Sequence, residues 1–278
     1  MTSRVRERAL LGVTGALLGV SVLAHVQFLL GGGEAFWIVV TLAMTGFCLT
    51  SSTHLMGVRN AVAFLIIGVS LGQFFETLSV HTGFPFGPYF YTGVFGRGLL
   101  GIPFIIPFAW YVIVYLSYVL ANLTIEHRPI VSGGVGQAIW LSLIGAAVVT
   151  AYDLALDPFM VTRIKAWVME NPGNYFGEQF RGFAGWMLTS FLISVVFRLT
   201  RRGVSVPAAS LSPLAATYPV VAYGLWAVFF AAAGEPQGTR PIAIFAMGIP
   251  TLTSISGLVK WQRLRRLTDA SVSARAGV

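Results

Sequence analysis

Three acidic side chains in apolar surroundings are the residues of this sequence best suited to chemistry. The chain has only 10 Asp and Glu in 278 residues, and Glu76, Asp153 and Asp157 fall inside apolar stretches long enough to cross a membrane. An ionisable group is costly there, so each position is a candidate functional site. The structural alternatives for Glu76 are an ion pair with Arg97 or a hydrogen bond with Gln73.

Asp153 and Asp157 are four residues apart, which places both on one face near the end of a helix. Repulsion between two carboxylates and the negative end of the helix dipole both favour a carboxyl that keeps its proton. Such an acid can donate a proton to carbon near neutral pH. As alternatives, Asp157 ends the helix because Pro158 follows it, or nearby basic residues neutralise the pair. Those residues are Arg163, Lys165 and Arg181.

Two segments next to these acids, 83–92 and 157–181, are rich in aromatic residues and contain Pro and Gly, which exclude a regular helix. Irregular backbone is tolerated in a membrane where it lines a cavity, so we expect the pocket here. Ring faces stabilise cations, and acids beside such rings fit carbocation chemistry on a lipid-soluble alkene. We expect the substrate to be bound by Phe84, Phe86, Tyr89, Tyr91, Tyr152, Tyr175 and Trp186, with His81 at the pocket mouth.

The whole sequence indicates, through its composition, which structural elements position these residues. It is 56% hydrophobic and 10% charged, with a mean hydropathy of +0.77, whereas a soluble domain has about 25% charged residues. Because lipid offers no partner for unpaired backbone groups, we predict an all-α, polytopic transmembrane helical bundle that forms a single integral membrane domain over 1–278. About eight spans are expected, at 9–30, 35–53, 60–81, 99–123, 134–157, 182–200, 213–233 and 240–260. Seven spans result if 35–53 or 213–233 does not cross.

The basic residues indicate topology rather than nucleic-acid binding, because they gather at the ends of the spans. With both termini cytoplasmic, 13 of the 18 Lys and Arg residues lie on the inner side and five on the outer side, as the positive-inside rule requires. We expect the inner residues to contact anionic lipids at the cytoplasmic face. The apolar run 9–30 is too long for a signal peptide, so we expect a retained helix.

The sequence offers no motif for a metal or a cofactor. Cys48 is the only cysteine, which excludes an intrachain disulfide, and the four histidines are scattered without metal-ligand spacing. The glycine-rich stretches do not fit a dinucleotide-binding fingerprint. We therefore predict chemistry without a metal and without a cofactor.

A series of motifs within about 65–190 supports a family resemblance. Glu76 is followed by Thr82-Gly83-Phe84-Pro85-Phe86-Gly87-Pro88-Tyr89, by Leu100-Gly101-Ile102-Pro103 and by Pro107-x-x-Trp110; further on come Tyr152-Asp153-Leu154-x-x-Asp157-Pro158, Tyr175-Phe176-Gly177 and Phe183-x-Gly185-Trp186. In this order they resemble the CruF-type carotenoid 1,2-hydratases, within the carotenoid biosynthesis membrane proteins. The resemblance implies cofactor-independent addition of water across the terminal double bond of an acyclic carotenoid, giving a tertiary alcohol. It assigns no catalytic roles.

From the residues themselves we expect Asp153 first, or Glu76, to protonate the alkene, and Asp157 or Glu76 to orient the water, with help from Tyr175. The substrate is a lipophilic carotenoid that enters from the bilayer, most plausibly in a prokaryotic plasma membrane, and other carotenoid-pathway enzymes are candidate partners. Three alternatives stay open: a carotenoid end cyclase, a membrane prenyltransferase, and a non-catalytic carotenoid- or lipid-binding protein.

Overall fold

The computed structural model describes residues 3–33, 36–201 and 211–276. This part of the chain forms eight helices that are long and apolar enough to cross a membrane, as the hydropathy pattern predicts. They are α1 (Ser3–Leu29), α2 (Phe36–Met56), α3 (Val58–Thr82), α4 (Ile105–Glu126), α5 (Val135–Phe159), α6 (Phe180–Thr200), α7 (Pro213–Ala233) and α8 (Thr239–Ala276). Arg202, one of the basic residues expected on the inner side, lies outside the described residues.

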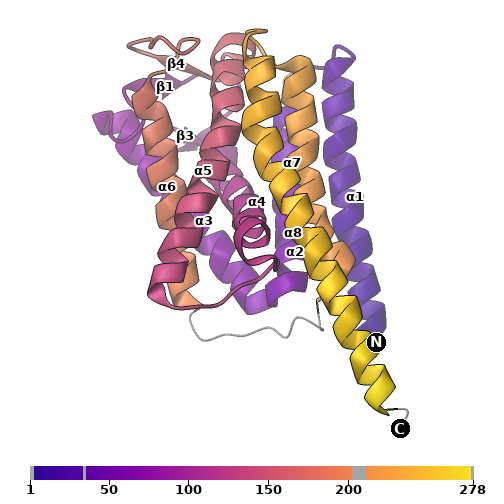
Figure 1. Cartoon of the computed structure of the whole chain (residues 1–278). Helices are drawn as coiled ribbons and strands as arrows, with labels where there is room; N and C mark the ends of the chain where they lie inside the picture. Colours follow the sequence, from indigo (N-terminus) through magenta and orange to yellow (C-terminus); the bar gives the residue numbers. More distant parts are fainter. Residues whose placement is uncertain (1–2, 34–35, 202–210, 277–278) are drawn as a thin grey trace.

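Successive helices pack as pairs around α4, which lies at the centre of the bundle (Figure 1). Apolar and aromatic residues occur on every face of α4, which is the pattern of a helix buried all round. Tyr111, Tyr115 and Tyr118 of α4 are almost completely buried. Both chain termini lie at the same end of the bundle (Figure 1), as an even number of spans requires.

The two irregular aromatic segments meet at the opposite end of the bundle in a small sheet. Strand β1 (Tyr89–Tyr91) pairs antiparallel with β4 (Trp167–Met169), and Tyr91 lies opposite Trp167. A second two-stranded sheet joins β2 (Gly98–Leu99) to β3 (Ile102–Pro103). Because side chains alternate along a strand, Tyr89 and Tyr91 point inward while Phe90 is exposed.

The Asp157-Pro158 pair does not end α5, contrary to the alternative that the sequence left open. The helix continues to Phe159 and into a π-helical turn, Met160–Ile164 (η1). Proline has no N–H to donate to the carbonyl four residues earlier, so Pro158 frees the carbonyl of Leu154. The hydroxyl of Tyr175 donates a hydrogen bond to that carbonyl over 2.9 Å, and the freed acceptor is thereby satisfied.

Candidate active site

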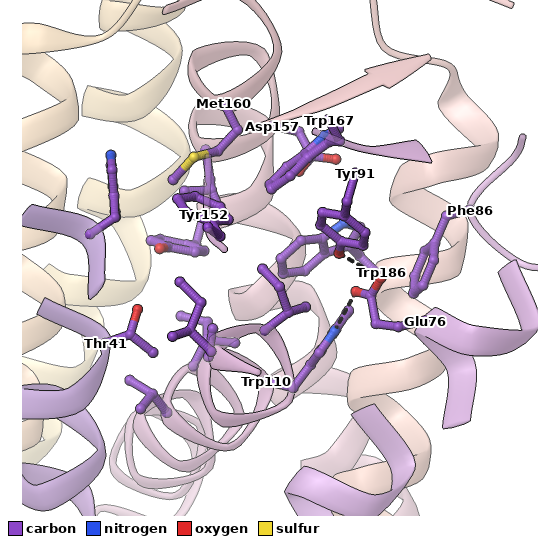
Figure 2. Close-up of a pocket in the computed structure, with 18 of the residues that line it drawn as sticks. Thr41, Glu76, Phe86, Tyr91, Trp110, Tyr152, Asp157, Met160, Trp167 and Trp186 are labelled. Atoms are coloured by element: carbon purple, nitrogen blue, oxygen red, sulfur yellow. Dashed lines mark hydrogen bonds between the residues drawn. The ribbon is translucent and has the colours of Figure 1, made fainter. Parts of the chain in front are cut away.

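A cavity of about 90 Å³ lies among α2 to α7 and the β1–β4 sheet. Figure 2 shows its ring-rich wall, in which Trp110, Trp186, Tyr91 and Phe86 surround the carboxyl of Glu76. At about 10–15 Å³ for each water, the cavity has room for several water molecules or for the end of a lipophilic chain. Two carboxyl groups, those of Glu76 and Asp157, are among its lining.

Glu76 is held by three hydrogen-bond donors. The Tyr91 hydroxyl donates to its Oε2 over 2.7 Å, the Tyr89 hydroxyl donates to the same oxygen, and Trp110 Nε1 donates to Oε1 over 2.7 Å. Gln73 instead donates to Thr77 and to the Leu99 carbonyl. Neither structural alternative for Glu76 therefore holds among the described contacts. An ionised carboxylate only accepts hydrogen bonds, and this cradle of donors fits that form.

Two glycines let the backbones come close enough to build this cradle. A Cβ atom on Gly72 of α3 would lie 2.8 Å from the Cβ of Trp110, so only glycine lets α4 approach and bring the indole to Glu76. A Cβ on Gly185 of α6 would lie 2.5 Å from Phe86 Cδ1. Small residues of this kind permit close helix packing in membranes, and here they set the position of Trp110, Phe86 and the neighbouring Trp186.

Asp157 faces the cavity, and Asp153 lies behind it. Both are buried, but only Asp157 is part of the cavity lining. Within the part of the chain that the structure describes, both oxygens of Asp153 and Oδ1 of Asp157 have no hydrogen-bond partner. Among the described residues, the three basic side chains expected to neutralise the pair do not do so. Arg163 pairs with Glu235 over 3.6 Å, and Lys165 and Arg181 are exposed.

Glu178 is a third buried acid at this position, and the sequence reasoning missed it. Its side chain is 1% exposed, and neither carboxyl oxygen has a hydrogen-bond partner. Burial and the negative charge of Asp157 raise the pKa of Glu178 to about 9, although the nearby indole of Trp167 opposes the shift. Glu178 therefore carries a proton at neutral pH. Acidic residues are rare in this chain, which has only 10, and this rarity could have marked Glu178 as a candidate. Its position outside the predicted helices gave no indication that it is buried.

The carboxyls of Glu76 and Asp157 line the same cavity and both influence the Tyr89 hydroxyl. Burial and the charge of Glu76 raise the pKa of the Tyr89 hydroxyl well above its usual value, and Asp157 adds to the rise. Tyr91 has its pKa raised by burial, Glu76 and Tyr89. Both hydroxyls thus stay protonated as donors, and the cavity brings together carboxyl groups from α3 and α5.

Five of the eight predicted substrate-contacting residues line the cavity: Phe86, Tyr89, Tyr91, Tyr152 and Trp186. The other three lie elsewhere. Phe84 is 48% exposed, His81 is exposed at the end of α3, and Tyr175 is bound to the Leu154 carbonyl beneath α5. The cavity also recruits residues from helices outside the motif region, which the sequence did not single out: Trp37, Val40 and Thr41 of α2 and Trp226 of α7.

The fold and the site define a polytopic membrane protein with an acid-bearing, ring-lined cavity. The chain belongs to the carotenoid biosynthesis protein family, whose model matches residues 32–249. It is 32% identical over 123 residues to the bisanhydrobacterioruberin hydratase of Haloarcula japonica, a match that covers 44% of this chain and 39% of that relative. The aligned region thus spans well under half of the relative's length. No solved structure matches the chain.

The family match covers the cavity and six of the eight helices, α2 to α7, completely, and it ends within the first part of α8. It confirms the resemblance to carotenoid biosynthesis proteins and, together with the eight apolar helices, identifies an integral membrane protein.

Proposed function

We propose that this protein adds water across the terminal carbon–carbon double bond of an acyclic carotenoid, giving a tertiary alcohol. The proposal is supported by the carotenoid biosynthesis family, by the hydratase activity in the name of a relative, and by the site. The single observation that carries it is a buried carboxyl, Asp157, that lines the same ring-lined cavity as Glu76 and has one oxygen without a hydrogen-bond partner among the described residues.

Asp157 is the proton donor in this proposal, in place of Asp153, the first choice from the sequence. Asp153 does not reach the cavity wall. Asp153, Asp157 and Glu178 form a cluster of three buried acids, and no described cation pairs with them. Closely spaced carboxyls cannot all ionise, so the cluster keeps protons available for Asp157.

The proton goes to the less substituted carbon of the alkene, and the electron pair of the double bond forms the new C–H bond. Positive charge then develops at the tertiary carbon, where the faces of the surrounding rings stabilise it. The indoles of Trp110 and Trp186 lie with their ring centroids 4.3 Å apart and provide the largest such surface on the Glu76 side.

Glu76 orients the water that captures this cation and accepts one of its protons. Its carboxylate is fixed by Tyr89, Tyr91 and Trp110, so it is pre-organised to hold a water in the cavity. The new C–O bond completes the alcohol, and transfer of the proton from Glu76 back to Asp157 through cavity water restores the starting state. Overall one alkene and one water give one alcohol, with no redox change.

Production of the protein in a host that makes lycopene tests the proposal. We expect a pigment heavier than lycopene by one water or two, and unchanged lycopene with Asp157→Asn. A second host should supply bisanhydrobacterioruberin, the compound in the name of the relative. Isomers of unchanged mass would indicate a cyclase, and a change of neither substrate by a correctly folded protein would contradict hydration.

The topology proposal is tested separately. We propose that both termini are cytoplasmic, because the basic residues concentrate at their end of the bundle, and that the membrane is the plasma membrane of a prokaryotic cell. A cytoplasm-active reporter fused to the C-terminus should then be active. An inactive reporter beside an active periplasmic one would reverse the orientation.

A further inference from the structure

A second buried polar site lies at the end of the bundle that carries the termini, far from the β1–β4 sheet (Figure 1). Arg198 and Arg201, in the last turn of α6 and just after it, are 6% and 3% exposed. Both line a small cavity between α4, α6 and the start of α5. Arginine is costly to bury in a membrane helix and marks a functional site by default.

The partners of both guanidinium groups are neutral. Arg198 Nη1 donates to Asn122 Oδ1 over 2.8 Å and the group stacks on the Tyr118 ring at 4.0 Å, while Arg201 Nη1 donates to the Tyr118 hydroxyl over 3.3 Å. Three further nitrogens have no hydrogen-bond partner among the described residues: Arg198 Nη2, Arg201 Nε and Arg201 Nη2. The two guanidinium groups therefore have buried N–H donors that are available to bind a ligand.

No acid compensates this pair of positive charges in the described structure. Glu126, an acid near the end of α4, accepts a hydrogen bond from the Gln137 amide over 2.6 Å and forms no ion pair with either arginine. The sequence 202–210, which follows directly, contains neither Asp nor Glu. Two like charges buried together without a counterion are strongly unfavourable, and a bound anion would remove that cost.

The backbone adds further donors at the same place. Helix α5 begins at Val135 without a side-chain cap, so the N–H groups of its first turn are free to bind an anion. Ser132, Gly133 and Gln137 from this start also line the cavity. The cavity measures about 10 Å³, roughly the space of one water, so a ligand inserts one oxygen and keeps its bulk outside.

We propose that Arg198, Arg201 and the start of α5 form a binding site for a phosphate-bearing anion. A phosphate group carries several strong acceptor oxygens, which match guanidinium donors and helix N–H groups together. The phosphate can belong to a lipid headgroup at the membrane surface or to a free phosphate in solution. This site is independent of the carotenoid cavity and of the proposed reaction.

Thermal unfolding of the purified protein in neutral detergent tests the site. Inorganic phosphate is compared with chloride at equal ionic strength, and phosphatidylglycerol micelles with micelles of a phosphate-free glycolipid. A rise in Tm of about 5 °C near saturation is expected. A rise with phosphatidylglycerol alone assigns a lipid headgroup, and a rise with inorganic phosphate assigns a free anion. No rise with either would overturn the proposal.

Variants link the shift to the two arginines. Arg198→Gln/Arg201→Gln should lose the shift while unfolding, without added phosphate, at a Tm no lower than that of the wild type, because an unpaired buried charge has been removed. Arg59→Gln is the matched control, an exposed arginine at the same end of the bundle, and it should keep the full shift. An undiminished shift in a folded double variant would contradict the site. If the double variant does not fold, native mass spectrometry of the wild type decides, since equal retention of phosphatidylglycerol and glycolipid would contradict it too.

Discussion

The two ends of this bundle bury ionisable groups of opposite kinds, and within the described residues neither group has a counterion. At the sheet end, Asp153, Asp157 and Glu178 have carboxyl oxygens without partners. At the other end, Arg198 and Arg201 have nitrogens without partners. An ion pair with a residue of the chain would offset the free-energy cost of burying each group. Two sites without such a pair indicate that each one interacts with a substrate or ligand.

The two ends of the bundle also differ in how their buried groups respond to burial. Carboxyls can relieve their repulsion by keeping protons, so the acid cluster becomes a store of protons beside a ring-lined cavity. Guanidinium groups stay charged under all ordinary conditions and need an anion. The first arrangement supports proton transfer to a substrate, and the second supports only binding.

Replacing Asp157 should have the largest effect. Asp157→Asn keeps the size of the side chain but removes the transferable proton, and general acids contribute about 10²–10⁴-fold. We expect hydrated product per unit of protein to fall at least 100-fold, as measured by chromatography. Asp153→Asn should be milder, since Asp153 does not line the cavity. A larger loss with Asp153→Asn would reverse the assignment of the two acids.

Glu76→Gln should lower the rate by about 100-fold, because an amide is a poor base for the attacking water. The three donors to Glu76 would also meet an N–H group in place of one oxygen. Glu235→Gln is a matched control: Glu235 is partly exposed, pairs with Arg163 and lies outside the cavity lining. If both variants hydrate the carotenoid equally well, Glu76 does not orient the water.

Glu178 gives the acid end of the bundle a pH dependence. Its usual pKa is 4.5 and its folded value is about 9, so the folded protein binds more protons than the unfolded chain between these values. Its contribution therefore makes stability fall as pH rises through this window, and the decline levels off above about pH 9. Glu178→Gln should flatten the profile of Tm against pH and raise Tm at pH 8.5. An unchanged profile would show that Glu178 titrates normally.

Gly185→Ala should lower stability by about 1–3 kcal/mol through overpacking. The new methyl group would lie 2.5 Å from Phe86 Cδ1 and would push this ring out of the cavity wall, so hydration should fall as well. Gly19→Ala in α1 is the control, since its Cβ would meet nothing within 4 Å. Equal thermal unfolding of the two variants would show that the close approach at Gly185 is unimportant.

The smallest effect is expected for Tyr175→Phe. It removes the hydrogen bond to the Leu154 carbonyl that Pro158 leaves free and should cost about 1 kcal/mol of stability. Hydration should persist, because Tyr175 is outside the cavity lining. A loss of activity at full stability would restore Tyr175 to the role of orienting water.

The sequence predicted what depends on composition and scarcity. Long apolar runs form helices in lipid, so the eight helices could be predicted. The rarity of acidic residues in these runs indicated Glu76 and Asp157. It could not predict contacts that depend on the pairing of distant segments. The β1–β4 register brings Tyr91 opposite Trp167, and Glu178 joins the acids only because the folded loop buries it near Asp157 and Trp167. Tyr175 was misplaced for the same reason, since the free carbonyl that binds it becomes visible only when α5 continues past Pro158.

The most direct test of the central claim, that a protein acid and water create the alcohol, is isotopic labelling with the purified protein. The acyclic carotenoid is incubated in water enriched in oxygen-18 and, separately, in deuterium oxide. We expect one oxygen-18 atom in each new hydroxyl and one non-exchangeable deuterium on the neighbouring carbon, with both labels absent for Asp157→Asn. An alcohol whose oxygen comes from dissolved dioxygen, or one that contains no carbon-bound deuterium, would contradict it.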